Sequence, residues 1–187
     1  MTAMTTEVLG LPRGRSLTRH DLDSMPDDGH RYELLDGVLL VSPAPRIIHQ
    51  QVLGKLFRLL HESAVDGKLE VLFAPVDVLL SEDTVIQPDL IVAPRDNFTD
   101  RDLPGPPLLA VEVLSPSTRG IDLMLKKERL QRAGCPHYWV VDPDEPSITA
   151  WSLVDGAYVE TARATGDAMF DVVDPLAVRL TPSSLLD

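Results

Sequence analysis

The chain has 187 residues, 44% of them hydrophobic and 25% charged, a composition typical of globular proteins that excludes disorder throughout. Its formal net charge of -12 weighs against holding a polyanion, because nucleic-acid affinity depends on Lys and Arg side chains that neutralise phosphates. The single cysteine, Cys135, excludes an internal disulfide framework and a multi-cysteine zinc site within one chain.

Charge is distributed unevenly along the chain. Between Arg119 and Arg132 there are five basic residues and two acids, whereas from Asp142 to Asp187 there are nine acids and two arginines. A basic segment can still contact DNA, and a bound divalent metal would offset acids near a site. The net charge therefore disfavours a nucleic-acid partner without excluding it.

Neither a membrane span nor a secretory signal is visible in the sequence. No run approaches the roughly 20 apolar residues that cross a bilayer, and residues 1–15 hold no apolar stretch of the signal-peptide kind. We therefore expect a cytoplasmic protein with no membrane partner. The length suits one domain, which we place at residues 18–187 after a flexible N-terminal tail at residues 1–17.

The first elements predicted are a short helix and a hairpin. Thr18 is a suitable N-cap for a helix over residues 19–25. Strands over residues 31–35 and 38–41 flank Asp36-Gly37, a dipeptide typical of two-residue hairpin turns. Glu33 is therefore expected on a strand.

An amphipathic helix and three short strands follow. Apolar residues recur at helical spacing over residues 48–63. The next apolar runs lie at residues 69–73, 76–80 and 85–92. The last run contains Pro88, which cannot donate to a sheet, so its strand should begin at Asp89 or lie on an edge. Residues 94–107 contain four prolines, and we expect an exposed loop there.

The middle of the chain has the pattern strand, helix, strand, at residues 108–114, 118–133 and 138–141. Such a unit joins two parallel strands through a right-handed crossover. Apolar runs around Asp155-Gly156 predict a second hairpin, at residues 148–153 and 157–161. The predicted fold class is α/β with a mixed sheet (α+β), flanked by helices and carrying N-terminal and C-terminal hairpins.

Two carboxylates interrupt runs that otherwise have the pattern of buried strands. Asp89 begins one strand and Glu112 lies near the end of another, so pairing of these strands would bring both acids to one end of a sheet. Burial of an unpaired acid is costly, which suggests a shared cation such as Mg²⁺, with the Val113 carbonyl and waters completing its coordination. The alternative is that Asp89 caps a turn and Glu112 pairs with an arginine, and the sequence chemistry leaves both open.

Lys126 is the third candidate residue. At about 100° per residue it shares a helical stripe with Leu123 and Leu130, so it should point toward the sheet. A lysine near two carboxylates could position or activate an attacking water. The simpler reading is an ordinary helix ion pair between Asp122 and Lys126.

Three further positions carry side chains capable of chemistry. Glu33 shares a strand face with Leu35, which permits an inward acid, although a solvated strand residue is the commoner case. His49 fits a helix-terminal or core histidine better than a ligand. Cys135 with His137 could form a thiol hydrolase, but Gly134-Cys135-Pro136 is a helix stop, which offers no helix N-terminus to lower the thiol pKa.

Taken together, several motifs resemble the Uma-two family, whose members are described as restriction-endonuclease-like proteins of the PD-(D/E)XK superfamily. The resemblance spans roughly residues 18–180. It rests on these segments: Tyr32 to Gly37, Pro43-Ala44-Pro45 with His49, Gln87 to Leu90, Val111 to Thr118, Asp122 with Lys126, and Ala133 to Pro143.

The resemblance implies a restriction-endonuclease-like core with Asp89 and Glu112 as metal ligands. The superfamily usually carries a lysine two positions after the second acid, where this chain has Leu114. The family moves that lysine to the following helix, which matches Lys126, and Glu33 matches an additional acid of the site.

The leading hypothesis is therefore a Mg²⁺- or Mn²⁺-dependent endonuclease that hydrolyses DNA with a metal-activated water. Asp89, Glu112 and Val113 would bind the metal, Lys126 and Glu33 would assist, and a homodimer would suit cleavage of both strands. The alternative is a catalytically inactive protein that uses the nuclease fold for binding or regulation, which net acidity and Leu114 favour.

Overall fold

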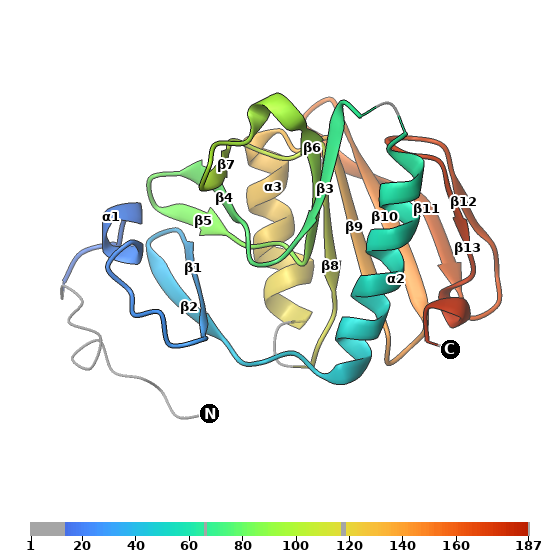
Figure 1. The fold of residues 1–187 in the computed structure, drawn as a ribbon, viewed down its shortest axis with the longest axis horizontal. Coiled ribbons are helices and arrows are strands. Elements are labelled where there is room, and N and C mark those ends of the chain that lie inside the picture. The colour runs from blue at the N-terminus through green and yellow to red at the C-terminus, as the bar shows by residue number, and fades with distance from the viewer. Residues whose placement is uncertain (1–13, 66, 117–118, 187) are drawn as a thin grey trace.

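The computed structural model describes residues 14–65, 67–116 and 119–186. Figure 1 shows two β-sheets side by side, with helices packed on the larger one. The helical elements in these ranges are α1 (Arg19–Leu22), α2 (Ile47–Ser63), the π-helix η2 (Ile121–Lys126), α3 (Lys127–Ala133) and two short 3-10 turns, η1 (Arg95–Asn97) and η3 (Pro182–Leu185). Helix α3 continues η2.

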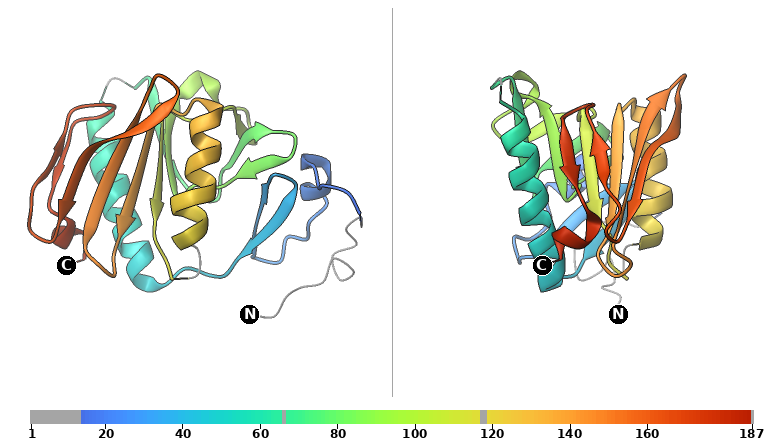
Figure 2. Two further views of the ribbon diagram at one scale, coloured as in Figure 1. Left: turned by 180° about the vertical axis from the view of Figure 1, so that it is seen from behind. Right: turned by 90° about the vertical axis from the view of Figure 1, so that its right-hand side faces the viewer.

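The larger sheet has six strands in the order β11-β10-β9-β8-β6-β3. Their bounds are β11 (Ala157–Thr165), β10 (Ser147–Val154), β9 (His137–Asp142), β8 (Leu109–Val113), β6 (Leu90–Pro94) and β3 (Leu69–Phe73). Only β8 and β9 are parallel, and η2 and α3 form the crossover between them. Helix α2 covers one face of this sheet, and η2 with α3 covers the other (Figure 2).

The second sheet has five strands in the order β2-β1-β5-β4-β7. They are β2 (Val38–Ser42), β1 (Arg31–Leu35), β5 (Thr84–Ile86), β4 (Asp77–Ser81) and β7 (Asp102–Pro104). A separate hairpin consists of β12 (Phe170–Val172) and β13 (Val178–Leu180). One of the connections between the two sheets is Gln87-Pro88-Asp89, which lies between β5 and β6.

Two hydrophobic clusters occupy the two faces of the larger sheet. The cluster beneath α2 includes Leu56, Trp139 and Phe170. The rings of Trp139 and Phe170 pack edge to face, with their centroids 5.3 Å apart. The cluster beneath α3 includes Leu130 and Tyr138 together with residues of the small sheet. Burial of apolar surface on both faces therefore fixes the large sheet between its helices and locks the small sheet against it.

Most predicted elements are confirmed. The fold is α+β with mixed sheets, both Asp-Gly hairpins are present, and the crossover from β8 to β9 is parallel. The run at residues 85–92 is split at Pro88 into β5 and β6, which belong to different sheets. The proline removes a ladder donor, and the chain changes sheet at that point.

One prediction about a loop is wrong, and one hairpin was not predicted. Residues 94–107 do not form a uniformly exposed loop, because β7 pairs in parallel with β4 and buries Asp102 and Leu103. Arg19 explains the buried acid, since its guanidinium pairs with the Asp102 carboxylate. The β12–β13 hairpin was not predicted, because each of its strands has only three residues and gives little alternation to recognise.

Part of the N-terminal tail predicted at residues 1–17 lies outside the described residues, as do Ser117 and Thr118 at the predicted helix start. Within the described part, Leu17 is buried, and its N–H donates to the Gly37 carbonyl at 2.9 Å. No helix in the described ranges is both long enough and apolar enough to cross a membrane.

Candidate active site

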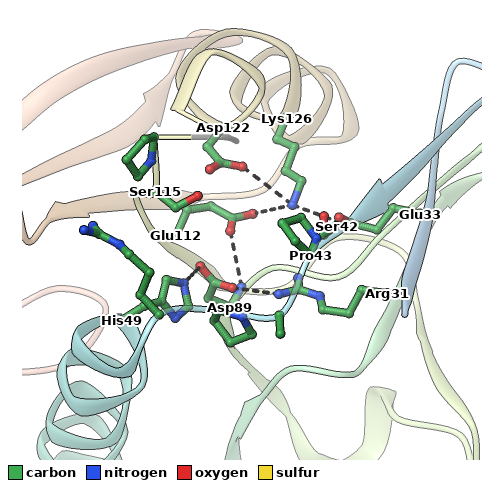
Figure 3. A pocket seen from close by; sticks show the side chains of 14 residues that line it. Arg31, Glu33, Ser42, Pro43, His49, Asp89, Glu112, Ser115, Asp122 and Lys126 are labelled. Atoms are coloured by element: carbon green, nitrogen blue, oxygen red, sulfur yellow. Dashed lines mark hydrogen bonds and ion pairs between the residues drawn. The ribbon is translucent and has the colours of Figure 1, made fainter. Parts of the chain in front are cut away.

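A pocket of about 260 Å³ lies where the two sheets meet, at the carboxyl end of β8 (Figure 3). Five places in the fold contribute side chains to it: strand β1, the start of α2, the residue before β6, the end of β8 and helix η2. The lining residues are Arg31, Glu33, Ser42, Pro43, Ala44, Pro45, Arg46, His49, Asp89, Glu112, Ser115, Pro116, Asp122 and Lys126. The pocket therefore gathers four of the five predicted site residues, and the fifth, Val113, follows Glu112 in the chain.

Asp89 and Glu112 lie together, as the strand pairing predicted. Strands β6 and β8 are antiparallel with Leu90 opposite Val111, so the residue before β6 adjoins the end of β8. The Asp89 N–H lies 3.4 Å from Glu112 Oε2, and the Val113 N–H donates to Asp89 Oδ2 at 2.9 Å. Both acids are buried, with at most 4% of either residue exposed.

Pro88 explains how the Asp89 carboxylate comes to occupy this place. Continuing the β6–β8 register by two residues sets Pro88 opposite Val113. Proline has no N–H, so the ladder ends there, and the Asp89 side chain accepts the Val113 N–H in place of a backbone carbonyl. The same missing donor leaves the Val113 carbonyl without a ladder partner from Pro88.

Lys126 points into the site, as its helical position predicted. Its Nζ lies 2.9 Å from Glu33 Oε1, 3.1 Å from Glu112 Oε1 and 3.7 Å from Asp122 Oδ1. The buried positions of this helix are Asp122, Lys126 and Leu130, while Met124 and Leu125 are exposed. The ordinary pair with Asp122 is thus present as well, but it belongs to a larger buried network.

Glu33 is an inward strand residue rather than a solvated one. It lies on β1 and is buried, and its Oε1 accepts hydrogen bonds from the Gln87 N–H at 2.6 Å and from the Lys126 ammonium group at 2.9 Å. Glu33 therefore ties the segment that leads into Asp89 to the ammonium group of η2.

Arg31 and His49 complete the site, and neither was predicted to belong to it. Arg31 Nη1 lies 3.0 Å from Asp89 Oδ1, and a second guanidinium nitrogen donates to the Gln87 carbonyl. His49 Nε2 lies 3.0 Å from Asp89 Oδ2. Strand alternation could have identified Arg31, because it lies two residues before Glu33 and hence on the same face. Only the fold shows that His49 reaches Asp89.

The electrostatics of the network divide its acids into two kinds. Burial acts to raise the pKa of Asp89, but the hydrogen bond and charge of His49 and the charge of Arg31 lower that pKa below its ordinary value. Burial raises the pKa of Glu112 well above its ordinary value, and the charge of Lys126 only partly opposes this. Asp89 is therefore stabilised as an anion, whereas burial favours the neutral form of Glu112 in spite of its contact with Lys126.

Lys126 remains protonated in this environment. Burial acts to lower the pKa of its ammonium group, but the charges of Glu112, Glu33 and Asp122 raise that pKa above its ordinary value. A lysine held in this state donates hydrogen bonds and does not accept a proton.

The donor set fits a hard divalent cation. Four buried acids, those of Glu33, Asp89, Glu112 and Asp122, surround two permanent cations, Arg31 and Lys126, so the pocket holds more acidic groups than permanent cations. Among the described residues no three His, Cys, Asp or Glu side chains are arranged as a ready ligand cluster. Mg²⁺ does not need such a cluster, because it is usually held by one or two carboxylates and retains waters.

Cys135 is placed where thiol chemistry is disfavoured. Its thiol is fully buried and contacts the His137 carbonyl at 3.2 Å, while the His137 ring lies 3.1 Å from Ser152 Oγ. Burial raises the pKa of Cys135 to about 11. The side chain that could have served as a base is therefore not directed at the thiol, and the thiol is protonated at neutral pH.

Comparison with solved structures defines the class of fold. Among four matching chains, one is described as "a putative nuclease belonging to DUF820 from Anabaena variabilis ATCC 29413". It superposes with a TM-score of 0.73, covers 91% of this chain and 97% of its own, and is 16% identical. At this identity the match shows a shared fold.

Comparison with family models identifies the family. The Uma2 model, described as "Putative restriction endonuclease", matches residues 19–183, which is most of the chain. The chain therefore belongs to the Uma2 family, as its motifs indicated. No curated protein matches the sequence.

Proposed function

We propose that this protein is a divalent-metal-dependent endonuclease that hydrolyses DNA phosphodiester bonds in the cytoplasm. The observation that carries the proposal is the convergence of Asp89, Glu112 and Lys126 in one buried pocket, although they come from three separate elements. Membership of the Uma2 family and the fold shared with a described nuclease support it.

Asp89 and Glu112 would hold Mg²⁺ or Mn²⁺, with the Val113 carbonyl as a third ligand. When bound, such a cation lowers the pKa of a coordinated water and polarises a phosphate oxygen. His49 and Arg31 would orient the Asp89 carboxylate, since each contacts one of its oxygens. An orienting partner behind a metal-binding carboxylate is typical of functional metal sites.

Lys126 would act by its charge. Because the surrounding acids raise its pKa, the ammonium group would orient the attacking water and stabilise the negative charge that develops on the phosphoryl oxygens. It is not the group that removes the proton from water.

We assign that proton transfer to Glu33. Both of its contacts among the described residues, from Gln87 and from Lys126, are made to Oε1, so Oε2 is available. Water would attack phosphorus as its proton passes to Glu33, and the bond from phosphorus to the leaving sugar oxygen would break, with that oxygen taking a proton from solvent.

Plasmid cleavage in Mg²⁺ or Mn²⁺ tests the proposal. Glu112→Gln and Lys126→Met should each lower the rate of nicking by at least about 100-fold, as expected for loss of a metal ligand or of preorganised charge. Asp171→Asn is the matched control, because Asp171 is an exposed acid on β12 outside the pocket. Unchanged cleavage in both site variants would assign the activity to a contaminant.

A second function is favoured by one specific observation. In the described residues the acids of the pocket already have cationic partners, Arg31 for Asp89 and Lys126 for Glu33 and Glu112. Acids that are already paired with protein cations are expected in a protein that uses the nuclease fold for binding or regulation and does not cleave a substrate. Specific DNA binding by the wild-type protein, with no cleavage in either metal, would select this alternative.

A further inference from the structure

Phe73 is the most exposed aromatic side chain in the described part of the chain. It ends β3, an edge strand of the large sheet, and 53% of it is exposed. The other Phe, Tyr and Trp residues are buried or partly buried. An aromatic ring left in water has a large apolar area available for a partner.

The Phe73 ring is held in place by an aromatic neighbour on α2. It packs edge to face on Phe57, with the ring centroids 5.1 Å apart and the planes at 90°. Phe57 also stacks on His61, one helical turn further along α2, and it packs against the core beneath that helix. The contact with Phe57 therefore fixes the Phe73 ring without covering it, so a partner would meet a surface that is already ordered.

Phe73 lies beside the candidate active site. It pairs with Leu90 across β3 and β6, and the N–H of Ala74 donates to the Asp89 carbonyl at 3.0 Å. Neighbouring strands are about 4.8 Å apart, so the Phe73 backbone lies one strand and one residue from Asp89. A nucleotide adjacent to a phosphate in the pocket is therefore within reach of the Phe73 ring.

Helix α2 makes this side of the molecule basic. Residues 37–61 contain no acid, which is the longest such run in a chain with 29 Asp and Glu residues, and they include Arg46, Lys55 and Arg58. The helix begins at the pocket, which Arg46 lines, and it lies beside β3 (Figure 1). This local charge is complementary to a phosphate backbone, although the net charge of the chain is -12.

The solvent-facing stripe of α2 leads away from the pocket. Its exposed residues recur at alternating spacings of four and three, and they are Ile47, Gln51, Gly54, Arg58 and His61. Apart from the helix itself, no described residue comes within 4 Å of the position that a Cβ would occupy at Gly54. A ligand can therefore approach the helix backbone closely in the middle of the stripe.

We propose that Phe73 stacks an unpaired base of the substrate while the substrate backbone follows the exposed stripe of α2 to the pocket. The inference rests on the proposed function and adds the substrate class, which is DNA that is single-stranded beside the cleaved phosphate. Single strands offer open base faces to an aromatic ring. In a continuous duplex both faces of a base are covered by its neighbours, and the duplex would first have to be unstacked.

Binding of labelled oligonucleotides, measured by fluorescence anisotropy in EDTA, tests the inference. Wild type should bind a single strand at least about 10-fold more tightly than a duplex of the same sequence at equal salt. Phe73→Leu retains an apolar contact with Phe57 but has no aromatic face, so it should lose about 10-fold in single-strand affinity and leave duplex affinity unchanged. Phe73→Trp should retain single-strand binding.

Phe98→Leu is the matched control. It makes the same chemical change at a partly buried phenylalanine that packs in the cluster beneath α3, on the other face of the large sheet. Its affinity for the single strand should equal that of the wild type. Circular dichroism of each variant establishes that it is folded.

Three outcomes would overturn the inference: no binding of the single strand by wild type, equal affinity for single strand and duplex, or unchanged single-strand affinity in Phe73→Leu. None of them depends on cleavage, because EDTA removes the divalent metal. A protein that nicks plasmid but shows one of these outcomes keeps the proposed function and loses the inference. A protein that binds as expected but does not nick plasmid in Mg²⁺ or Mn²⁺ keeps the stacking surface and loses the proposed function.

Discussion

The ammonium group of Lys126 lies 2.9 Å from Glu33 Oε1, which links a helix of the large sheet to a strand of the small one. The contact is buried, and the same nitrogen also contacts Glu112 at 3.1 Å. A single side chain therefore compensates acids from two sheets, and its removal should affect the stability of the whole fold as well as the site.

Lys126→Met should destabilise the protein by about 3–5 kcal/mol at neutral pH, because it leaves buried carboxylates without their cation. Urea unfolding at neutral pH measures the loss. Lys55→Met is the control, since Lys55 makes an exposed contact, and its effect should stay within about 0.5 kcal/mol. Equal effects of the two substitutions would contradict the buried network.

The effect of Glu112→Gln on stability should depend on pH in metal-free protein. Burial raises the folded pKa of Glu112, so its contribution to stability is fully present below the unfolded pKa and is lost as pH rises through the folded pKa. The glutamine variant has no such loss. Its stability relative to wild type should increase with pH, by at most about 1.4 kcal/mol per pH unit. Denaturant unfolding in EDTA measures the difference, and a difference independent of pH would be inconsistent with a raised pKa.

The two Asp-Gly hairpins provide a matched pair for backbone effects. Gly37 and Gly156 both have positive φ, 73° and 81°, so alanine is strained at either position. A Cβ at Gly37 would also lie 2.5 Å from Ser16 Cβ, whereas none of the described residues approaches within 4 Å of one at Gly156. Gly37→Ala should therefore destabilise more than Gly156→Ala, by at least about 1 kcal/mol, as expected for overpacking. Thermal unfolding measures the stability loss of each variant. Equal losses would show that the contact with Ser16 does not contribute.

The Cys135 thiol should be inert in the folded protein. Because burial raises its pKa to about 11, almost no thiolate exists at neutral pH, and the side chain is enclosed. An aromatic disulfide reagent should release one equivalent of chromophore after denaturation and almost none before it. Rapid reaction of the native protein would revive the thiol-hydrolase alternative.

Local sequence signals were sufficient for much of the fold. Asp36-Gly37 specified the hairpin that carries Glu33, and Pro88 specified where a strand ends. Helical spacing correctly predicted that Lys126 points inward. Burial of apolar residues such as Leu130 fixes which face of the helix meets the sheet, and Lys126 lies on that face.

Contacts between distant segments could not be read from the sequence in the same way. Arg31 and His49 meet Asp89 only because two sheets and a helix converge on the segment before β6. The π-helical turns of η2 and the parallel pairing of β7 with β4 depend on tertiary packing, which local propensity does not encode. The convergence of the predicted acids was foreseeable, whereas the identity of their partners was not.

Asp89 and Glu112 together should bind a divalent cation. Calorimetric titration of the metal-free protein with Mn²⁺ measures this binding, with Glu112→Gln as the site variant and Asp171→Asn as the control outside the pocket. We expect one binding event per chain in wild type and control, and at least about a 10-fold loss of affinity in Glu112→Gln. Absence of binding in the wild type, or equal affinity in all three proteins, would contradict it.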